Sequence, residues 1–252
     1  MADPAPSTEP AMSFLEHLDE LRSRLFRVAI VFVVLLAVCW FMSDRILAFL
    51  MKPIREHLLG GGDIIFIALT EPFMVYMKAS AIAALFLSAP YILWQFWGFV
   101  APGLYKKERR AGGVFIVAGT IFFVAGGAFG YYVALPTTAR WLLTLGSQFK
   151  AQLTLQSAFD FESRMLLGAG LVFEMPIVIL VLSRFGIVTP GFLMRHFRFA
   201  VMAIAIAAAV ITPSGDALTM TIFALPMIAL YLIGVGFAWI AARPAADKPA
   251  SS

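Results

Sequence analysis

Six long apolar runs constrain what this chain can fold into. A helix that crosses the hydrocarbon core of a bilayer needs about 20 mostly apolar residues. The runs cover residues 25–42, 74–99, 112–135, 165–183, 199–212 and 219–240. Only 13% of the residues are charged, against about a quarter in soluble domains. The chain is therefore predicted to be an all-α integral membrane protein with six transmembrane helices. They would form one membrane domain over residues 13–242, between Pro- and Ala-rich tails at 1–12 and 243–252 that are expected to be disordered.

The positions of Lys and Arg predict how these helices are oriented, because cytoplasmic loops carry an excess of both. The side that holds the N-terminus has the larger share: Arg22, Arg24, Arg27, Lys106, Lys107, Arg109, Arg110, Arg184, Arg195, Arg198, Arg243 and Lys248. The other side has Arg45, Lys52, Arg55, Lys78, Arg140, Lys150 and Arg164. We therefore expect an N-in/C-in protein of a cytoplasmic membrane, with both tails in the cytoplasm.

The apolar runs differ in length and in proline content. The run 199–212 would be about 21 Å long at about 1.5 Å per residue, which is short for a hydrocarbon core of about 30 Å. Proline removes a backbone donor from a helix and bends it. Three runs contain one each, and Pro90, Pro176 and Pro226 are therefore expected to mark kinks. The prediction is a bundle with curved walls.

Two further patterns concern the loops and the packing of the third run. The long loops 43–73 and 136–164 mix apolar and charged residues, which predicts short interfacial helices. Gly126 and Gly130 form a GxxxG motif. Close packing against another helix is its expected meaning, although a functional role stays open.

Most catalytic and binding chemistries are excluded by their missing motifs. The sequence has no GxxxxGK[ST], HExxH or GxSxG, and its three histidines lack the spacing of metal ligands. The single cysteine, Cys39, rules out an intramolecular disulfide and a CxxC site. A net charge of +4, spread between the apolar runs, does not suggest a nucleic-acid surface. We expect no enzymatic activity, no cofactor, no metal and no nucleic-acid partner.

The stretch before the first run predicts an amphipathic helix on the cytoplasmic surface. Ser13 and Glu16 have the spacing of a capping box. The apolar stripe of this helix would be Phe14, Leu18, Leu21 and Leu25. On the other side, Glu20 and Arg24 are four residues apart. Such pairs are commonly solvent-exposed ion pairs, and that reading stays open beside a functional one.

Two further carboxylates, Glu108 and Glu174, are candidates for a functional role. Glu108 stands among four basic residues, so it should be ionised, as part of either a solvated charge run or a binding site. Glu174 lies well inside an apolar run, two residues before Pro176. A carboxylate in a membrane is costly and is functional by default. Three roles are open for Glu174: a cap for backbone freed by the kink, a proton relay, or a docking point for a polar group of a partner helix.

At these residues the chain resembles the TatC family, the polytopic subunits of the twin-arginine protein translocase. The resemblance spans the chain except for its tails. It rests on HLDELRSRL at 17–25, SAPYILWQFWGFVAPGLYKKERR at 88–110, FEMPI at 173–177 and ITPSGD at 211–216. The resemblance implies a glove-shaped, concave bundle in the bacterial inner membrane. It further implies a receptor that binds the paired arginines of signal peptides on folded cargo proteins, in a process driven by the proton-motive force.

The same resemblance assigns roles to particular residues. Glu20 and Glu108 would accept the arginine pair, and arginine forks match carboxylates in a way that lysine cannot. Weaker resemblances place four more residues on the receptor surface: His17, Arg22, Phe99 and Arg109.

Other positions would contact partner subunits. Glu174 would face the concave side, where single-span subunits of the TatA and TatB type dock, and the outer end of the fifth helix would contribute Thr212 and Asp216. Further copies of the chain and membrane lipid are also implied as partners.

Two other functional classes stay open. A secondary transporter or proton-coupled channel would place Glu174 at its midplane, but transporters line their path with several polar groups. A membrane enzyme is a more distant alternative. The near isolation of Glu174 argues against transport of a small hydrophilic solute.

Overall fold

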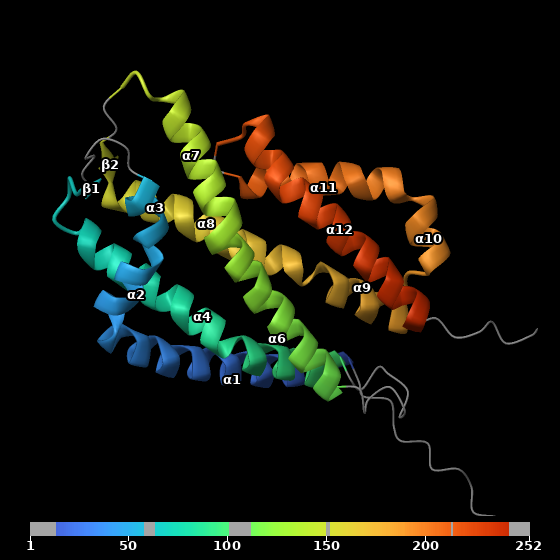
Figure 1. Cartoon of the computed structure of the whole chain (residues 1–252). Helices are drawn as coiled ribbons and strands as arrows, with labels where there is room; N and C mark the ends of the chain where they lie inside the picture. Colours follow the sequence, from blue (N-terminus) through green and yellow to red (C-terminus); the bar gives the residue numbers. More distant parts are fainter. Residues whose placement is uncertain (1–13, 58–63, 101–111, 150–151, 213, 242–252) are drawn as a thin grey trace, which may run out of the picture.

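The structure, a computed structural model, describes residues 14–57, 64–100, 112–149, 152–212 and 214–241 and is almost entirely helical (Figure 1). The predicted tails lie outside the described residues. The helices are α1 (Phe14–Phe41), α2 (Ser43–Leu50), α3 (Lys52–His57), α4 (Glu71–Val100), α6 (Gly112–Phe129), the π-helical turn η2 (Gly130–Ala134), α7 (Leu135–Leu145), α8 (Leu155–Phe173), α9 (Met175–Arg184), α10 (Pro190–Arg195), α11 (Phe197–Ile211) and α12 (Ala217–Ala241). The strands β1 (Ile64–Ile65) and β2 (Leu153–Thr154) pair in parallel.

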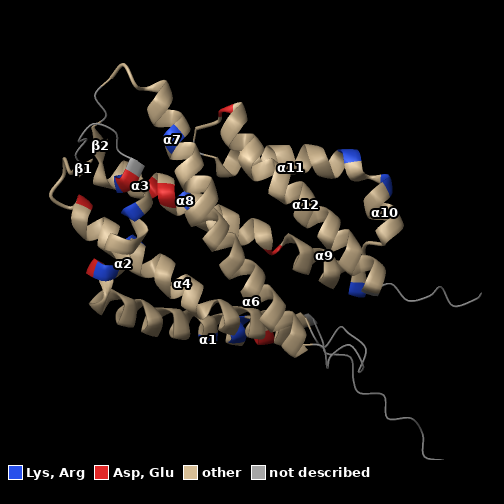
Figure 2. Cartoon of the chain, viewed as in Figure 1, with Lys and Arg blue, Asp and Glu red and all other residues tan. Residues whose placement is uncertain are grey.

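Five helical segments of the described chain are long and apolar enough to cross a membrane. They are Leu15–Phe41, Glu71–Val100, Gly112–Leu145, Leu155–Arg184 and Ala217–Ile240. Figure 2 shows that charged residues lie mostly toward helix ends and leave the middles of α4, α6 and α12 uncharged. The sixth predicted span corresponds to α11, whose 15 residues measure about 22 Å at about 1.5 Å per residue. Length therefore supports five spans and one short apolar helix.

The first helix differs from the prediction. The sequence predicted a surface helix followed by a separate span beginning at residue 25. The structure has one helix, α1, because no Gly or Pro interrupts it. Leu18, Leu21 and Leu25 of the predicted apolar stripe are exposed. The other side of α1 packs along α4 (Figure 1). Glu20 and Arg24 are partly buried there, whereas Asp19, Arg22 and Arg27 are exposed.

Helix α8 lies at the centre and contacts α4, α6, α11 and α12. Its approach to α6 depends on the predicted GxxxG glycines. A Cβ on Gly126 would lie 2.5 Å from the carbonyl oxygen of Ala169, and a Cβ on Gly130 would lie 3.1 Å from that of Met165. Only a glycine leaves room for backbones this close. The prediction of close helix packing is confirmed.

The three prolines have different effects on their helices. Pro90 and Pro226 lie inside α4 and α12, which continue through them. At Pro176 the helix is interrupted instead: α8 ends at Phe173, and Pro176 occupies the first turn of α9, where its missing N–H is not needed. This interruption leaves Glu174 at the junction between two helices.

The loop predictions were half correct. Short helices do follow α1, namely α2 and α3. The second loop is much shorter than predicted, because the helix continues through η2 and α7 to Leu145 and α8 already starts at Leu155. The π turn widens the backbone directly before Pro136, whose ring would clash with a regular turn. Thr154 starts α8 as its N-cap, accepting a hydrogen bond of 3.2 Å from the Ser157 N–H.

The ends of the bundle form two faces. We call the end where α1 begins, α4 ends and α6 begins the N-terminal face. We call the opposite end, with α2, α3, β1 and β2, the far face (Figure 1). At the far face, Ile64 pairs with Leu153 and joins the two loops.

Candidate functional site

An ion pair between Glu20 and Arg24 is the centre of a polar cluster at the N-terminal face. Both residues are on α1. The Arg24 Nε and Nη2 atoms donate to Glu20 Oε1 over 2.9 and 2.5 Å. The two side chains are only 21% and 23% exposed. The pair predicted from the i, i+4 spacing is therefore present, but it is largely covered by protein rather than solvated.

Helix α4 covers the ion pair between Glu20 and Arg24. Arg24 Nη1 donates to the Gln95 side-chain oxygen over 3.2 Å, and the Gln95 amide donates to the Tyr91 hydroxyl over 2.9 Å. A Cβ on Gly98 would collide with the Arg24 guanidinium, so a larger residue there would displace the arginine from this position. These contacts fix Arg24, and through it the orientation of the Glu20 carboxylate.

His17 and Phe99 complete the cluster. Their rings stack with centroids 4.2 Å apart and an interplanar angle of 15°. His17 Nδ1 lies 3.8 Å from Glu20 Oε2, which is too long for a hydrogen bond. Oε2 is buried and has no hydrogen-bond partner among the described residues. One carboxylate oxygen is thus held by an internal arginine, while the other can still accept a hydrogen bond.

The structure brings together three of the six residues predicted for signal-peptide binding: His17, Glu20 and Phe99. Arg22 is exposed on another side of α1, with its guanidinium 5.7 Å from the centroid of the Phe26 ring. Glu108 and Arg109 lie outside the described residues. Arg24 was predicted only as the ion-pair partner of Glu20, and Gln95 was missed. Gln95 could have been found, since it is the only amide side chain in the apolar segment YILWQFW.

Glu174 lies at the α8–α9 junction, where it borders a cavity of about 450 Å³ between α4, α6, α8 and α9. All other residues that line this cavity are apolar. Glu174 Oε1 is buried and has no hydrogen-bond partner in the described part of the chain. Of the three roles left open by the sequence, the cap is the least supported, because the side chain caps neither helix. The arrangement suits a polar group that comes from outside the chain.

Thr212 and Asp216 lie at the turn between α11 and α12. Thr212 is buried, and its hydroxyl donates to the Ala208 carbonyl over 2.8 Å. Asp216 caps α12 by accepting from the Thr219 N–H over 2.9 Å and from the hydroxyls of Ser214 and Thr219. Burial opposes its ionisation, but these hydrogen bonds lower the pKa of Asp216 to about 2. Both side chains thus have internal partners, and their contact with another subunit stays a prediction.

One acidic residue was misplaced by the sequence analysis. Glu162 was assigned to a loop, but it lies on α8 and is only 1% exposed, so Glu174 is not the only carboxylate inside an apolar span. Its two oxygens and the Thr138 hydroxyl are buried without hydrogen-bond partners among the described residues. The N-cap at Thr154 was the signal that could have extended the helix over Glu162.

The described residues contain no group of three or more His, Cys, Asp or Glu side chains that could hold a metal ion. In the Glu20 cluster, a carboxylate held by Arg24 keeps one oxygen without a hydrogen-bond partner among the described residues. Such an acceptor is chemically suited to a cation that donates hydrogen bonds.

Comparisons with known proteins agree with the residues that carry the resemblance. The family model for "Sec-independent protein translocase protein (TatC)" matches residues 16–226. The TatC protein of Koribacter versatilis (strain Ellin345) is 37% identical over 252 residues, covering 94% of this chain and 93% of that protein. TatCy of Bacillus subtilis (strain 168) is 33% identical over 250 residues, covering 96% of each. A crystal structure of the twin-arginine translocase receptor TatC matches with a TM-score of 0.79 at 30% identity, covering 90% of this chain and all of that one.

Proposed function

The chain belongs to the TatC family of Sec-independent protein translocase proteins, and we propose that it is the signal-peptide receptor and core subunit of a twin-arginine translocase. As a TatC protein it is a non-enzymatic membrane subunit of that translocase. The proposal adds that it binds the paired arginines of signal peptides and assembles with TatA- and TatB-type subunits and with further copies of itself. Folded proteins would then cross the cytoplasmic membrane, driven by the proton-motive force.

One observation carries the receptor proposal: Glu20 Oε2 is buried, lacks a hydrogen bond within the described residues, and belongs to a carboxylate fixed by Arg24. An incoming guanidinium can donate to Oε2 while Arg24 keeps Oε1. The stacked rings of His17 and Phe99 offer a flat surface beside it. The contact of Arg24 with Glu20 is an example of how an arginine can bind this carboxylate. The second arginine of the signal peptide would pair with Glu108.

The receptor face must be cytoplasmic for this function, because signal peptides are made in the cytoplasm. The proposed topology is N-in/C-in, with α11 completing a sixth, short span. The excess of Lys and Arg on the side of the N-terminus supports it. The bundle would then be concave toward its partner subunits, with the Glu174 cavity on that side.

Binding of a twin-arginine signal peptide to variants of the purified full-length protein tests the receptor role. Glu20→Gln keeps the size of the side chain and removes its charge, so binding should weaken by about 1.5 to 3 kcal/mol, the worth of a charge-assisted hydrogen bond. Asp19→Asn is the matched control, since Asp19 is the neighbouring carboxylate and is exposed. Equal binding by wild type and Glu20→Gln would remove Glu20 from the site.

A second part of the proposal assigns Glu174 to docking a polar side chain of a TatA- or TatB-type helix. The free buried oxygen and the apolar cavity around it support this assignment. In an apolar surrounding, a polar group gains most by meeting another polar group. A proton relay is the alternative, and the two make opposite demands: docking needs hydrogen-bonding capacity, whereas a relay needs a proton that can leave.

A transport assay on two Glu174 variants, with crosslinking from position 174 to the small subunits, separates these roles. Glu174→Gln can still form hydrogen bonds and should keep much of the transport, whereas Glu174→Ala should lose more. Complete loss of transport in Glu174→Gln with unchanged crosslinks would exclude docking and favour the relay.

A further inference from the structure

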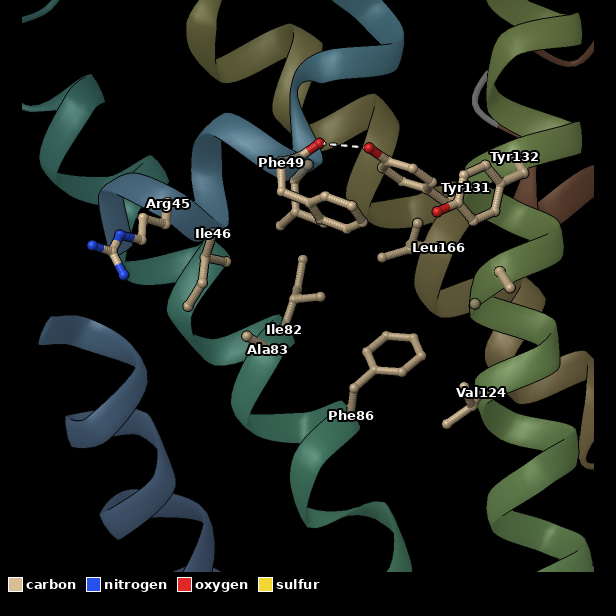
Figure 3. A pocket seen from close by; sticks show the side chains of 13 residues that line it. Arg45, Ile46, Phe49, Ile82, Ala83, Phe86, Val124, Tyr131, Tyr132 and Leu166 are labelled. Atoms are coloured by element: carbon tan, nitrogen blue, oxygen red, sulfur yellow. Dashed lines mark hydrogen bonds between the residues drawn. The ribbon is translucent and has the colours of Figure 1, made fainter. Parts of the chain in front are cut away.

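An apolar cavity opens on the far-face half of the molecule, between α2, α4 and α6 (Figure 3). Its volume is about 440 Å³, and the apolar side chains in its wall include Ile46, Phe49, Ile82, Phe86, Val124 and Leu166. Arg45 is the only charged residue on its border, and its guanidinium points away from the cavity (Figure 3). The Tyr131 hydroxyl donates to the Phe49 carbonyl over 2.6 Å and is thereby satisfied within the wall. This cavity suits a hydrocarbon.

A second, polar cavity adjoins the first. It has a volume of about 310 Å³ and lies between α3 and α7, and it shares Phe49, Tyr131 and Tyr132 with the apolar cavity. Its charged residues are Lys52, Glu56 and Arg140. Lys52 and Glu56 form a loose pair at 3.8 Å. Arg140 is exposed and makes no ion pair with any described residue. The polar cavity therefore carries an excess positive charge and suits an anion.

An apolar cavity beside a second cavity bordered by Lys52 and Arg140 fits an amphiphile. We propose that this groove binds an anionic phospholipid, with one acyl chain in the apolar cavity and the headgroup phosphate held by Arg140 and Lys52. Phe49 and Tyr132 are 54% and 68% exposed, so the lip shared by the two cavities is open to a ligand that crosses it. The groove contacts α4 near the middle of that helix, at Ile82, Ala83 and Phe86. The Glu20 cluster contacts α4 nearer its C-terminal end, at Gln95 and Phe99, so the two sites share no residue.

The size of the apolar cavity favours an acyl chain over a partner helix. One helical turn, about 10 Å wide and about 5.4 Å long, takes up roughly 400 Å³. The cavity is thus about the size of one helical turn, which is short for a partner helix that crosses the membrane, whereas a thin flexible chain can fill it along its length. Arg140, which makes no ion pair with a described residue, gives the second reason, because the phosphate of a lipid whose acyl chain fills the cavity would neutralise it.

Native mass spectrometry of the purified full-length protein tests the headgroup contact. The protein is titrated with phosphatidylglycerol and with phosphatidylcholine of identical acyl chains. We expect phosphatidylglycerol to bind more tightly. Arg140→Gln should weaken its binding about fivefold, the equivalent of one cation near a lipid phosphate. Lys52→Gln should act in the same direction. The matched control is Arg164→Gln, an exposed arginine of α8 that does not line the groove.

A second variant tests the acyl-chain contact. Ala128 is exposed and lines the apolar cavity, so Ala128→Phe fills the cavity without disturbing the core. This variant should lose binding of both lipids while its melting temperature stays that of the wild type. Glycerol phosphate, a headgroup without a chain, should not displace phosphatidylglycerol. Equal affinity for the two lipids, or binding unchanged in both Arg140→Gln and Ala128→Phe, would overturn the proposal.

Discussion

Asp216 and Glu174 are both acidic residues at a helix end, but their surroundings are opposite. Asp216 accepts hydrogen bonds from Ser214 and Thr219, so its charge is satisfied within the chain. Glu174 has a buried oxygen without any partner among the described residues. The first residue is thus an N-cap that stabilises α12, and the second is available to a ligand. Sequence spacing alone could not separate the two cases, since both residues stand beside a proline or a turn.

The role of Asp216 as a cap predicts a pH-dependent stability. Asp216→Ala should cost about 1 kcal/mol. The pKa of Asp216 is lowered to about 2 in the folded protein, whereas that of an unfolded Asp is about 3.9. The stabilisation by the ionised group is therefore fully present above about pH 4 and is lost as the pH falls through about 2.

Thermal unfolding of wild type and Asp216→Asn checks the predicted pH dependence of this stabilisation. Asn can still cap the helix but cannot ionise, so the difference in melting temperature should be constant from pH 7 to 4 and shrink below pH 4. A difference that disappears between pH 7 and 5 would contradict the assignment.

Some features of the receptor residues could be predicted from the sequence, and others could not. Glu20 was predicted from the motif that contains it, and the i, i+4 pair with Arg24 followed from helical spacing. That the pair is covered rather than solvated depends on Gln95, which lies 71 residues from Arg24 in the chain. A contact of this kind between two helices has no local signal in the sequence.

At the scale of helices, the packing of α6 on α8 depends on glycine. Gly126→Ala would bring a Cβ to 2.5 Å from the Ala169 carbonyl oxygen, and neither backbone can move without separating the helices. Overpacking of this kind costs about 1 to 3 kcal/mol.

The matched control for this substitution is Gly236→Ala in α12, where an added Cβ meets nothing within 4 Å. Since alanine favours a helix over glycine by about 1 kcal/mol, this variant should be as stable as the wild type or more so. In thermal unfolding, Gly126→Ala should melt at a lower temperature than the wild type, and Gly236→Ala at the same temperature or a higher one. Equal melting temperatures for the two variants would refute the role of Gly126.

The long helices were located from the sequence, but several of their limits were missed. The apolar runs located every long helix, because burial in lipid needs a continuous apolar segment. The continuation of the helix from α6 through η2 into α7 was missed. The π turn makes room for Pro136 within the helix, and composition does not reveal such a turn. The pairing of Ile64 with Leu153 was also missed, because two residues of strand carry no periodicity.

At the scale of the whole molecule, the N-in/C-in topology is open to direct measurement. Reporter domains fused after Lys248 or within 106–110 should be cytoplasmic. Reporters within 55–63 or 147–156 should be external, because the helices between these positions each cross the membrane once. A cytoplasmic reporter within 147–156 would contradict the topology.

The central claim is that the Glu20 carboxylate binds an arginine of the signal peptide. A double-mutant cycle measures this contact directly. Binding is determined for wild type and Glu20→Gln, each with a twin-arginine peptide and with peptides in which one arginine is replaced by glutamine. Asp19→Asn serves as the control receptor. We predict a coupling energy of at least about 1 kcal/mol between Glu20 and one arginine, and none for Asp19. Strictly additive effects of Glu20→Gln and of both peptide substitutions would contradict the claim.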